Sequence, residues 1–276
     1  MVWSDGEFLE EENFKISPFD RGLCHGLSLF ETLLAVDGRL CLLPEHLERM
    51  RQSLAGIGVT SIRLDDAQLR EAMASLLHKN GLEKGHARLR FAVSFGVGAL
   101  NHLDGGKPWS WMTAVAVSLE DRALRVMPAP WKHEKAGLLV GLKTGNYAAQ
   151  IIAMDKARRE GFDELLFYNH DGELCEAAMA NVFLIHDDCL FTPSLESGCL
   201  PGIARAFVLH LASSHGIKCV EKILLENDVQ SAYGIFLTSS VKGPVWVSEY
   251  AGRSYQPHPL FLSLRKSWHD KMADCE

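Results

Sequence analysis

Two residues of this sequence have the types and the settings that imine chemistry requires. Lys143 lies in Leu-Lys-Thr-Gly-Asn-Tyr, which we expect to be a turn between a strand and a helix. Glu176 lies in the apolar run Leu-Cys-Glu-Ala-Ala-Met-Ala-Asn-Val-Phe, where a buried carboxylate would need a cationic partner. A lysine can form an imine with an aldehyde cofactor, and a carboxylate can keep a pyridine nitrogen protonated so that the ring accepts electrons. The two residues therefore predict pyridoxal phosphate as the cofactor.

Each of these residues also has a plainer interpretation. Lys143 could be a surface lysine at the end of a strand, and Glu176 could face water on an alternating strand. The setting of Lys143 favours the catalytic interpretation, because burial disfavours the ammonium form and leaves a lysine nucleophilic near neutral pH.

A cofactor phosphate would need hydrogen-bond donors, and the sequence offers several. A loop ends and a helix begins in Gly-Cys-Leu-Pro-Gly-Ile-Ala-Arg, where free backbone N–H groups could hold an anion. The candidate donors are the N–H groups of Gly202, Ile203 and Ala204, the hydroxyl groups of Ser239 and Ser240, and the guanidinium of Arg49. The alternatives are an ordinary helix start, a turn rich in hydroxyl groups, and a solvated arginine.

Composition and charge limit the classes of protein that fit this chain. It has 276 residues, of which 47% are hydrophobic and 23% charged, which is enough for two domains. A net charge of −7 without a basic block argues against a nucleic-acid surface, and the acidic start and the short apolar runs argue against a signal peptide or a membrane span. We expect a soluble, cytoplasmic protein whose partners are a small-molecule amino substrate and a second protomer.

Cysteine and histidine usage predicts no metal site and no disulfide framework. The seven cysteines are odd in number and form no C-x-x-C pair. The histidines show no metal-ligand spacing supported by acidic neighbours. The thiols are therefore expected to be reduced.

The first part of the chain, residues 1–120, has the pattern of helices laid on an antiparallel sheet. Asp37-Gly38 lies between two apolar runs and predicts a hairpin. Apolar residues repeat at helical spacing over 44–57 and 65–79, which predicts two helices. These features predict a smaller α/β domain.

Residues 121–135 lose this periodicity and contain two prolines, which is typical of a connection between domains. The remainder, residues 136–276, would form the second domain. Its expected elements are a strand over 137–142, a helix that ends at Arg159, a strand over 173–185 and a helix over 203–214.

Several motifs in order resemble the class IV aminotransferases, the fold-type IV group of pyridoxal-phosphate enzymes. The resemblance covers about residues 17–248. It rests on Ser17-Pro-Phe-Asp-Arg-Gly-Leu-Cys-His-Gly-Leu-Ser-Leu-Phe-Glu-Thr, Pro44-Glu-His-Leu-Glu-Arg-Met, Leu142-Lys-Thr-Gly-Asn-Tyr, Glu176-Ala-Ala-Met-Ala-Asn-Val-Phe and Thr192-Pro-Ser-Leu-Glu-Ser-Gly-Cys-Leu-Pro-Gly-Ile-Ala-Arg. It implies an α+β fold with a smaller N-terminal α/β domain and a larger C-terminal pseudo-barrel domain, in a homodimer.

The resemblance also implies roles for individual residues. Lys143 would form the imine with the cofactor and move a proton between the substrate carbon and the cofactor, and Glu176 would pair with the pyridine nitrogen. The phosphate would be held by Arg49, by the N–H groups of Ile203 and Ala204, and by Ser240. Further cofactor contacts are expected from Tyr147, Asn181, Gly202 and Ser239.

Residues expected to face the substrate include departures from the family pattern. His25 stands where the family commonly has Tyr or Phe, and Leu33-Leu34 replaces a frequent Arg or Lys, which makes branched-chain activity less expected. Ala204 replaces a Thr or Ser that would donate to the phosphate. Phe30 is also expected at the substrate, and Arg88 and Arg90 could receive a substrate carboxylate or be solvated strand residues.

The motifs resemble the aminodeoxychorismate lyase branch most, which would release pyruvate and form 4-aminobenzoate for folate synthesis. The alternative is a transaminase that moves an amino group between a D- or L-amino acid and a 2-oxo acid. A non-catalytic relative that binds ligands is a third hypothesis, and the joint presence of Lys143, Glu176 and Arg49 argues against it.

Overall fold

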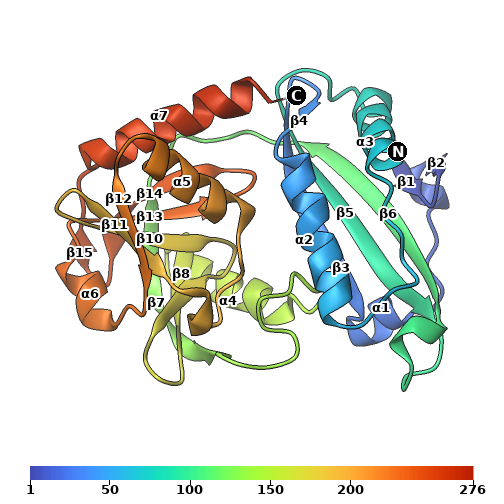
Figure 1. Ribbon diagram of the computed structural model, residues 1–276, viewed down its shortest axis with the longest axis horizontal. Helices are drawn as coiled ribbons and strands as arrows, with labels where there is room; N and C mark the ends of the chain where they lie inside the picture. The colour runs from blue at the N-terminus through green and yellow to red at the C-terminus, as the bar shows by residue number, and fades with distance from the viewer. Residues whose placement is uncertain (276) are drawn as a thin grey trace. The chain divides into compact units, whose positions relative to one another are not determined.

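The computed structural model describes residues 1–275 and divides the chain into two compact units (Figure 1). The first unit contains Met1–Leu119, Leu142–Asn146 and the chain from Met272 onward, and the second contains Glu120–Gly141 and Tyr147–Lys271. The chain first passes between the units at residue 119, next to the expected domain end at residue 120. The segment that carries Lys143 belongs to the first unit, whereas the sequence pattern assigned it to the second domain.

The first unit is built on a six-stranded antiparallel sheet with the strand order β2-β1-β6-β5-β3-β4. Its strands are β1 (Val2–Ser4), β2 (Glu7–Leu9), β3 (Ser28–Val36), β4 (Arg39–Leu40), β5 (His86–Val97) and β6 (Lys107–Ala116). The β3–β4 hairpin turns through Asp37 and Gly38, both with positive φ, as the Asp-Gly signal predicts.

Two helices supply the core of this unit from one side of the sheet. They are α2 (Leu43–Gly56) and α3 (Asp66–Lys79), and Figure 1 shows α2 lying along β3. Leu47, Met50 and Leu54 of α2 are buried with Leu33 and Phe91 of the sheet, as their helical spacing predicts. Each such side chain stabilises the fold by about 2 kcal/mol through burial of apolar surface.

Arg21 organises the loop that connects β5 to β6. It lies in the short helix α1 (Arg21–His25) and is 2% exposed. Its guanidinium donates hydrogen bonds to the backbone carbonyls of Phe95, Gly96, Ala99, His102 and Leu103, over 2.5 to 3.0 Å. The short 3₁₀ helix η2 (Leu103–Gly105) lies in this loop.

Replacement of Arg21 with lysine is expected to destabilise the first unit by about 2 kcal/mol, because one ammonium group cannot reach five carbonyls and leaves some of them unsatisfied. Urea denaturation measures the change. Arg63→Lys, at an exposed position, is the matched control. Equal stability of the two variants would contradict the role of Arg21.

The second unit is built on a nine-stranded mixed sheet with the order β12-β11-β10-β13-β14-β7-β8-β9, and β15 pairs with β14. Its strands are β7 (Leu124–His133), β8 (Glu164–Asn169), β9 (Leu174–Ala177), β10 (Asn181–His186), β11 (Cys189–Pro193), β12 (Lys218–Lys222), β13 (Gly234–Ser239), β14 (Gly243–Tyr250) and β15 (Arg253–Ser254). The sheet curls until β9, at one end of the order, also contacts β10 and β11. This curled sheet is the expected pseudo-barrel.

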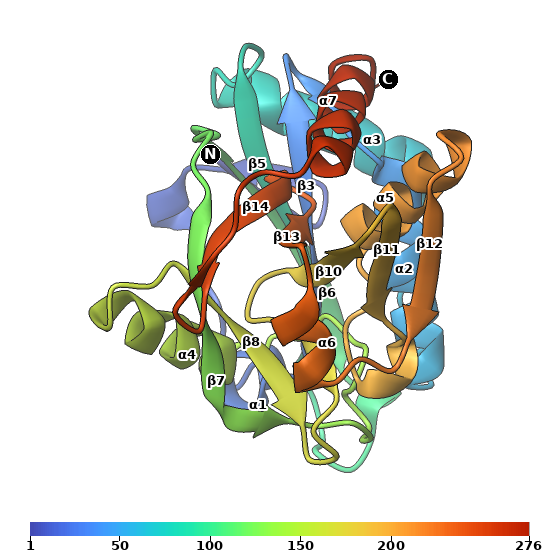
Figure 2. The same ribbon diagram turned by 90° about the vertical axis from the view of Figure 1, so that its left-hand side faces the viewer.

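Helices cover the sheet of the second unit. They are α4 (Ala148–Arg159), α5 (Ile203–Ser214), α6 (Glu226–Ser231) and α7 (Pro259–Ala273). Figure 2 shows α4 beside β7 and β8, and α5 contacts β12 and β13. The predicted helix over 203–214 is confirmed as α5. Among residues 1–275, no helix combines the length and the apolar character needed to span a bilayer.

Three predicted elements of the second unit differ in the structure. Residues 121–135 contain strand β7 rather than only a connection, and residues 137–141 form bends and turns rather than a strand. The predicted strand over 173–185 is two strands, β9 and β10, because a tight turn in which Ala177 N–H donates to Ala180 O separates them. Small residues in this turn do not interrupt the apolar pattern, so the sequence gives no sign of it.

Candidate active site

Lys143 is held at the open edge of β3. Strand β4 pairs only with the end of β3, so the first half of β3 has a free edge. Residues 143–145 occupy it: Phe30 N–H donates to Lys143 O at 2.9 Å, and Gly145 N–H donates to Ser28 O at 2.8 Å. A Cβ atom at residue 145 would overlap Ser28 Oγ, so a larger residue there would force the Ser28 side chain to move. The backbone of Lys143 is therefore fixed by the first unit.

Phe30 contacts two cationic side chains. Its ring centroid is 4.4 Å from Lys143 Nζ and 3.6 Å from the Arg90 guanidinium carbon. Arg90 stands opposite Thr32 in the β3–β5 pairing, and Arg88 stands opposite Leu34 further along the same face. The structure thus brings Lys143, Phe30 and Arg90 together, whereas Arg88 is an exposed residue.

A buried polar cluster lies under α2 in the first unit. The carboxylate of Glu31 accepts hydrogen bonds from Arg49 Nε at 2.8 Å and Arg49 Nη2 at 2.5 Å, and His46 Nδ1 lies 2.6 Å from Glu31 Oε2. Glu31 and His46 are each 1% exposed and Arg49 is 7% exposed. Arg49 is therefore not the solvated helix residue of the alternative interpretation. Its guanidinium is oriented by Glu31.

Electrostatics within this cluster favour an ionised Glu31 beside a neutral His46. Burial raises the pKa of Glu31, but the hydrogen bond from His46 and the charge of Arg49 outweigh it and lower the pKa to about 2. Burial lowers the pKa of His46 against the opposing effect of Glu31. His46 Nε2 is buried and has no hydrogen-bond partner among residues 1–275.

Glu176 lies on β9 in the second unit and is held from three directions. Its Oε2 accepts hydrogen bonds from Leu200 N–H at 3.0 Å and from Asn181 Nδ2 at 3.3 Å, and its Oε1 lies 3.7 Å from His133 Nε2. The Glu176 side chain is 16% exposed. It is therefore a fixed, mostly buried carboxylate rather than one that faces water.

Asn181 connects this carboxylate to the start of α5. Its Nδ2 also donates to Leu200 O at 2.9 Å, and its Oδ1 lies where a Cβ atom at Gly202 would have to be. No side chain caps the N-terminus of α5, where Gly202 precedes Ile203 and Ala204. Asn181 therefore positions Glu176 and the Gly202 turn.

The second unit also supplies hydroxyl groups at the end of β13, the strand that pairs with Asn181. Thr238 stands opposite Asn181, and its buried Oγ1 has no hydrogen-bond partner within residues 1–275. Ser239 Oγ accepts a bond from Lys242 N–H, and Ser240 is partly buried. The second unit thus offers the Thr238 hydroxyl group, the uncapped N–H groups at the start of α5 and the fixed Glu176 carboxylate. These donors and this acceptor fit a phosphorylated pyridine.

The predicted residues Tyr147 and His25 lie in different units. Tyr147 precedes α4 and belongs to the second unit. His25 is an exposed residue at the end of α1 in the first unit. Next to it, Gly26 O accepts a hydrogen bond from Asn146 Nδ2 at 3.2 Å, which joins the end of α1 to the segment that carries Lys143.

Glu164 supports the turn that follows Glu176. It is 5% exposed and accepts hydrogen bonds from the N–H groups of Leu165, Ala178 and Met179. Burial raises the pKa of Glu164 to about 7, although these donors oppose the shift. Glu31 and His46 lie within the quoted motifs but were given no role there, and Glu164 and His133 lie outside every motif. Each is revealed by its buried or close polar contacts.

Glu164 should make stability fall as the pH rises. Its pKa of about 7 in the folded chain lies above the ordinary value of 4.5 for a glutamate, so the folded chain binds more protons than the unfolded chain between pH 4.5 and pH 7. We expect the free energy of unfolding of the native chain to decrease by at least about 2 kcal/mol more than that of Glu164→Gln between these pH values. Urea denaturation across the window measures the difference, and parallel curves would contradict it.

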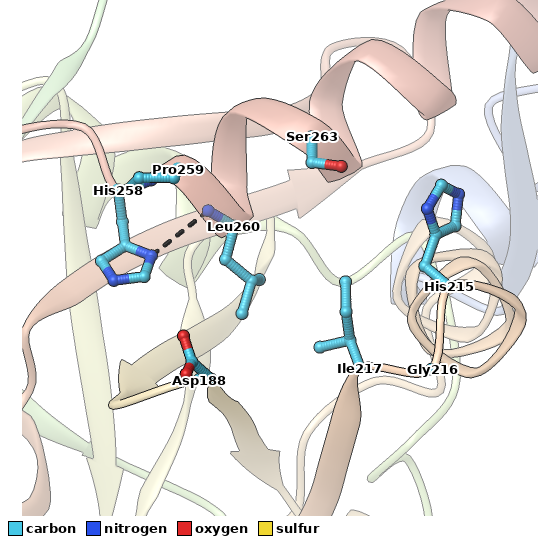
Figure 3. A pocket seen from close by; sticks show the side chains of 8 residues that line it. All are labelled: Asp188, His215, Gly216, Ile217, His258, Pro259, Leu260 and Ser263. Atoms are coloured by element: carbon cyan, nitrogen blue, oxygen red, sulfur yellow. Dashed lines mark hydrogen bonds between the residues drawn. The ribbon is translucent and has the colours of Figure 1, made fainter.

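A separate open cleft of about 520 Å³ lies near the start of α7 (Figure 3). Asp188, His215, Ile217 and His258 are among its lining residues, and His258 Nδ1 accepts a hydrogen bond from Leu260 N–H at 3.3 Å. None of the predicted cofactor or substrate residues lines this cleft. Within residues 1–275, no group of three acidic, histidine or cysteine side chains could hold a metal ion.

Comparisons with known proteins connect this arrangement to one family. A Methanocaldococcus jannaschii protein with the provisional name branched-chain-amino-acid aminotransferase is 30% identical over 99% of both chains. Aminodeoxychorismate lyase of Bacillus subtilis is 27% identical over 79% of this chain and 75% of its own length. A Legionella pneumophila crystal structure, provisionally described as a 4-amino-4-deoxychorismate lyase, matches with a TM-score of 0.88 and 26% identity over 94% of this chain and 96% of its own.

The family assignment follows from a match to a family model. Residues 28–250 match the amino-transferase class IV family, and this match covers most of the chain and includes Lys143 and Glu176. Enzymes of this family use pyridoxal phosphate, and the solved relatives have the fold-type IV architecture that the motifs predicted. This chain belongs to the class IV aminotransferases and is a pyridoxal-phosphate-dependent enzyme.

Proposed function

We propose that this enzyme is an aminodeoxychorismate lyase, which converts 4-amino-4-deoxychorismate into pyruvate and 4-aminobenzoate for folate synthesis. The observation that carries this proposal is the Arg90 guanidinium, which shares the Phe30 ring with Lys143. In this substrate, the carbon next to the amine-bearing carbon carries the enolpyruvyl group and its carboxylate. Arg90 contacts the same aromatic ring as the reactive lysine, so its guanidinium is suited to bind that carboxylate. Two of the similar proteins described above bear the lyase name.

Lys143 and Glu176 would have distinct roles in this reaction. Pyridoxal phosphate, when bound, supplies a ring that accepts electrons from the substrate. Lys143 Nζ would remove the proton from the amine-bearing carbon, and the C–O bond to the enolpyruvyl group at the neighbouring carbon would then break as the product ring becomes aromatic. The enolpyruvate that leaves would take up a proton to become pyruvate. Glu176 keeps the pyridine nitrogen protonated.

Further residues are proposed to contact the cofactor. Arg49, oriented by Glu31, would bind the phosphate, as would backbone N–H groups at the start of α5 and hydroxyl groups at the end of β13. These groups belong to Gly202, Ile203, Ala204, Ser239 and Ser240. Asn181 would act by positioning Glu176, and Tyr147 would contact the cofactor.

Transamination between a D- or L-amino acid and a 2-oxo acid is the second candidate function. It is favoured by the relative from Methanocaldococcus jannaschii, which matches the whole chain. The same Lys143 would then return the proton to the cofactor rather than complete an elimination. Conversion of the bound cofactor to its amine form by an amino acid, read from its absorbance, would identify this reaction.

We propose a homodimer as the working assembly. Within the second unit, Leu138, Ile151 and Ile152 are 94%, 58% and 64% exposed, which is unusual for aliphatic side chains on α4 and the segment before it. Sedimentation of the native chain and of Ile151→Glu tests this assembly. A monomer in the native chain would contradict it.

Arg90 provides a test of the substrate class. Replacement of Arg90 with methionine keeps the aliphatic stem and should raise KM for aminodeoxychorismate by about tenfold or more, because a charge-assisted bond to a carboxylate contributes about 1.5 to 3 kcal/mol. Steady-state assays of pyruvate and 4-aminobenzoate measure this change. Arg88→Met, further along the same face, is the matched control, and equal KM values in both variants would contradict the role of Arg90.

A further inference from the structure

His133 lies against the carboxylate that the proposed function assigns to the pyridine nitrogen. It is the last residue of β7, and its side chain is 19% exposed. Its Nδ1 lies 2.9 Å from Glu134 O, its Nε2 lies 3.7 Å from Glu176 Oε1, and its ring packs beside Phe167 with centroids 5.8 Å apart. The imidazole is therefore fixed with one nitrogen toward a carbonyl and the other toward Glu176.

The contacts of the two His133 ring nitrogens indicate which of them carries a hydrogen. A carbonyl oxygen can only accept, so Nδ1 carries a hydrogen and donates it to Glu134 O. Glu176 already accepts from Leu200 N–H and Asn181 Nδ2, and both bonds favour its ionised form. An unprotonated Nε2 would present a lone pair to that anion. A proton on Nε2 removes this repulsion and makes an imidazolium–carboxylate pair.

We propose that His133 is a positioning residue whose charge sets how strongly Glu176 holds a proton on the cofactor's pyridine nitrogen. The inference rests on the proposed pairing of Glu176 with that nitrogen. A cationic His133 stabilises the carboxylate and repels a pyridinium, so both effects ease loss of the ring proton. A neutral His133 strengthens the hold of Glu176 on that proton. The charge of His133 therefore influences the electron-accepting power of the ring.

Other ionisable groups around Glu176 are less suited to this role. Burial and the charge of Glu176 raise the pKa of Cys175 to about 12 and that of Cys199 to about 11, so both thiols stay neutral at physiological pH. The nearby cation Lys135 is bound to Asp171 and Glu173. The Glu134 side chain is 75% exposed and lies 4.0 Å from His170. His133 Nε2 lies 3.7 Å from Glu176 Oε1, and an imidazole can be either neutral or cationic.

The test follows the pyridine nitrogen itself. Holoenzyme is prepared with pyridoxal phosphate labelled with ¹⁵N in the ring, and its ¹⁵N chemical shift is recorded from about pH 5 to pH 10. His133→Arg keeps a fixed cation, His133→Gln removes the charge, and His170→Gln is the matched control at an exposed histidine of the same unit. Removal of a charge a few ångströms away should separate the ring midpoints of the first two variants by about half a pH unit or more, with His133→Arg lower.

The ring midpoint of the unmodified chain should lie between those of His133→Arg and His133→Gln or coincide with one of them, and His170→Gln should follow the unmodified chain. Superimposed curves for His133→Arg and His133→Gln would overturn the proposal. Glu176→Gln distinguishes the role of Glu176 from that of His133, because it should abolish protonation of the ring nitrogen whatever the charge of His133. If it does so while the His133 variants coincide, the role of Glu176 stands and that of His133 falls. If Glu176→Gln changes nothing, both roles fall.

Discussion

Replacement of Lys143 with alanine is expected to lower the rate of pyruvate formation by about a thousandfold or more and to abolish covalent attachment of the cofactor. The variant lacks both the amine that binds the aldehyde and the base that moves the substrate proton. The fold should survive, because the segment is held on β3 through the backbone of Lys143 and Gly145 rather than through the lysine side chain.

Two measurements check this result. Steady-state assays give the rate, and borohydride reduction followed by peptide mass spectrometry locates the attached cofactor. Lys156→Ala is the matched control, because Lys156 lies on α4 in an exposed ion pair with Glu160. Cofactor attachment at another lysine in Lys143→Ala would contradict the assignment.

Replacement of Glu31 with glutamine should destabilise the first unit by about 3 to 5 kcal/mol, because Arg49 would lose its buried carboxylate partner. Cofactor affinity should fall as well, since Glu31 orients the guanidinium proposed to bind the phosphate. Urea denaturation and fluorescence titration with pyridoxal phosphate measure the two effects. Glu48→Gln, at an exposed position of α2, should change neither.

The effect of Glu31 should also depend on pH. Its pKa of about 2 in the folded chain lies below the ordinary value of 4.5 for a glutamate, so its contribution to stability is complete above pH 4.5 and is lost as the pH falls toward 2. The stabilities of the native chain and of Glu31→Gln should therefore converge in acid. A constant difference between them down to pH 3 would show that the ion pair is not the source of the effect.

Local patterns predicted the elements that form from nearby residues. The Asp37-Gly38 hairpin and helices α2, α3 and α5 follow from turn chemistry and from apolar residues at helical spacing. Strand β7 was not predicted, because its central position between β14 and β8 depends on pairing with distant segments. The segment around Lys143 likewise depends on an open edge of β3, which no pattern near residue 143 reveals.

The residues predicted for the site were found through motifs, and their supporting contacts were not. Lys143, Phe30 and Arg90 meet in the first unit, and Glu176, Asn181 and the Gly202 turn meet in the second. The supporting residues Glu31, His46, Glu164 and His133 act through burial and close polar contacts. Such contacts arise only after the chain has folded, so residue type and spacing do not indicate them.

The most direct test of the lyase proposal is incubation of limiting cofactor-loaded enzyme with excess aminodeoxychorismate while pyruvate, 4-aminobenzoate and the cofactor spectrum are recorded together. We expect equal amounts of both products over many turnovers, with the cofactor remaining in its aldehyde-derived form and with no 2-oxo acid added. No pyruvate release by an enzyme that branched-chain or other amino acids convert to the amine form would contradict the lyase and indicate a transaminase.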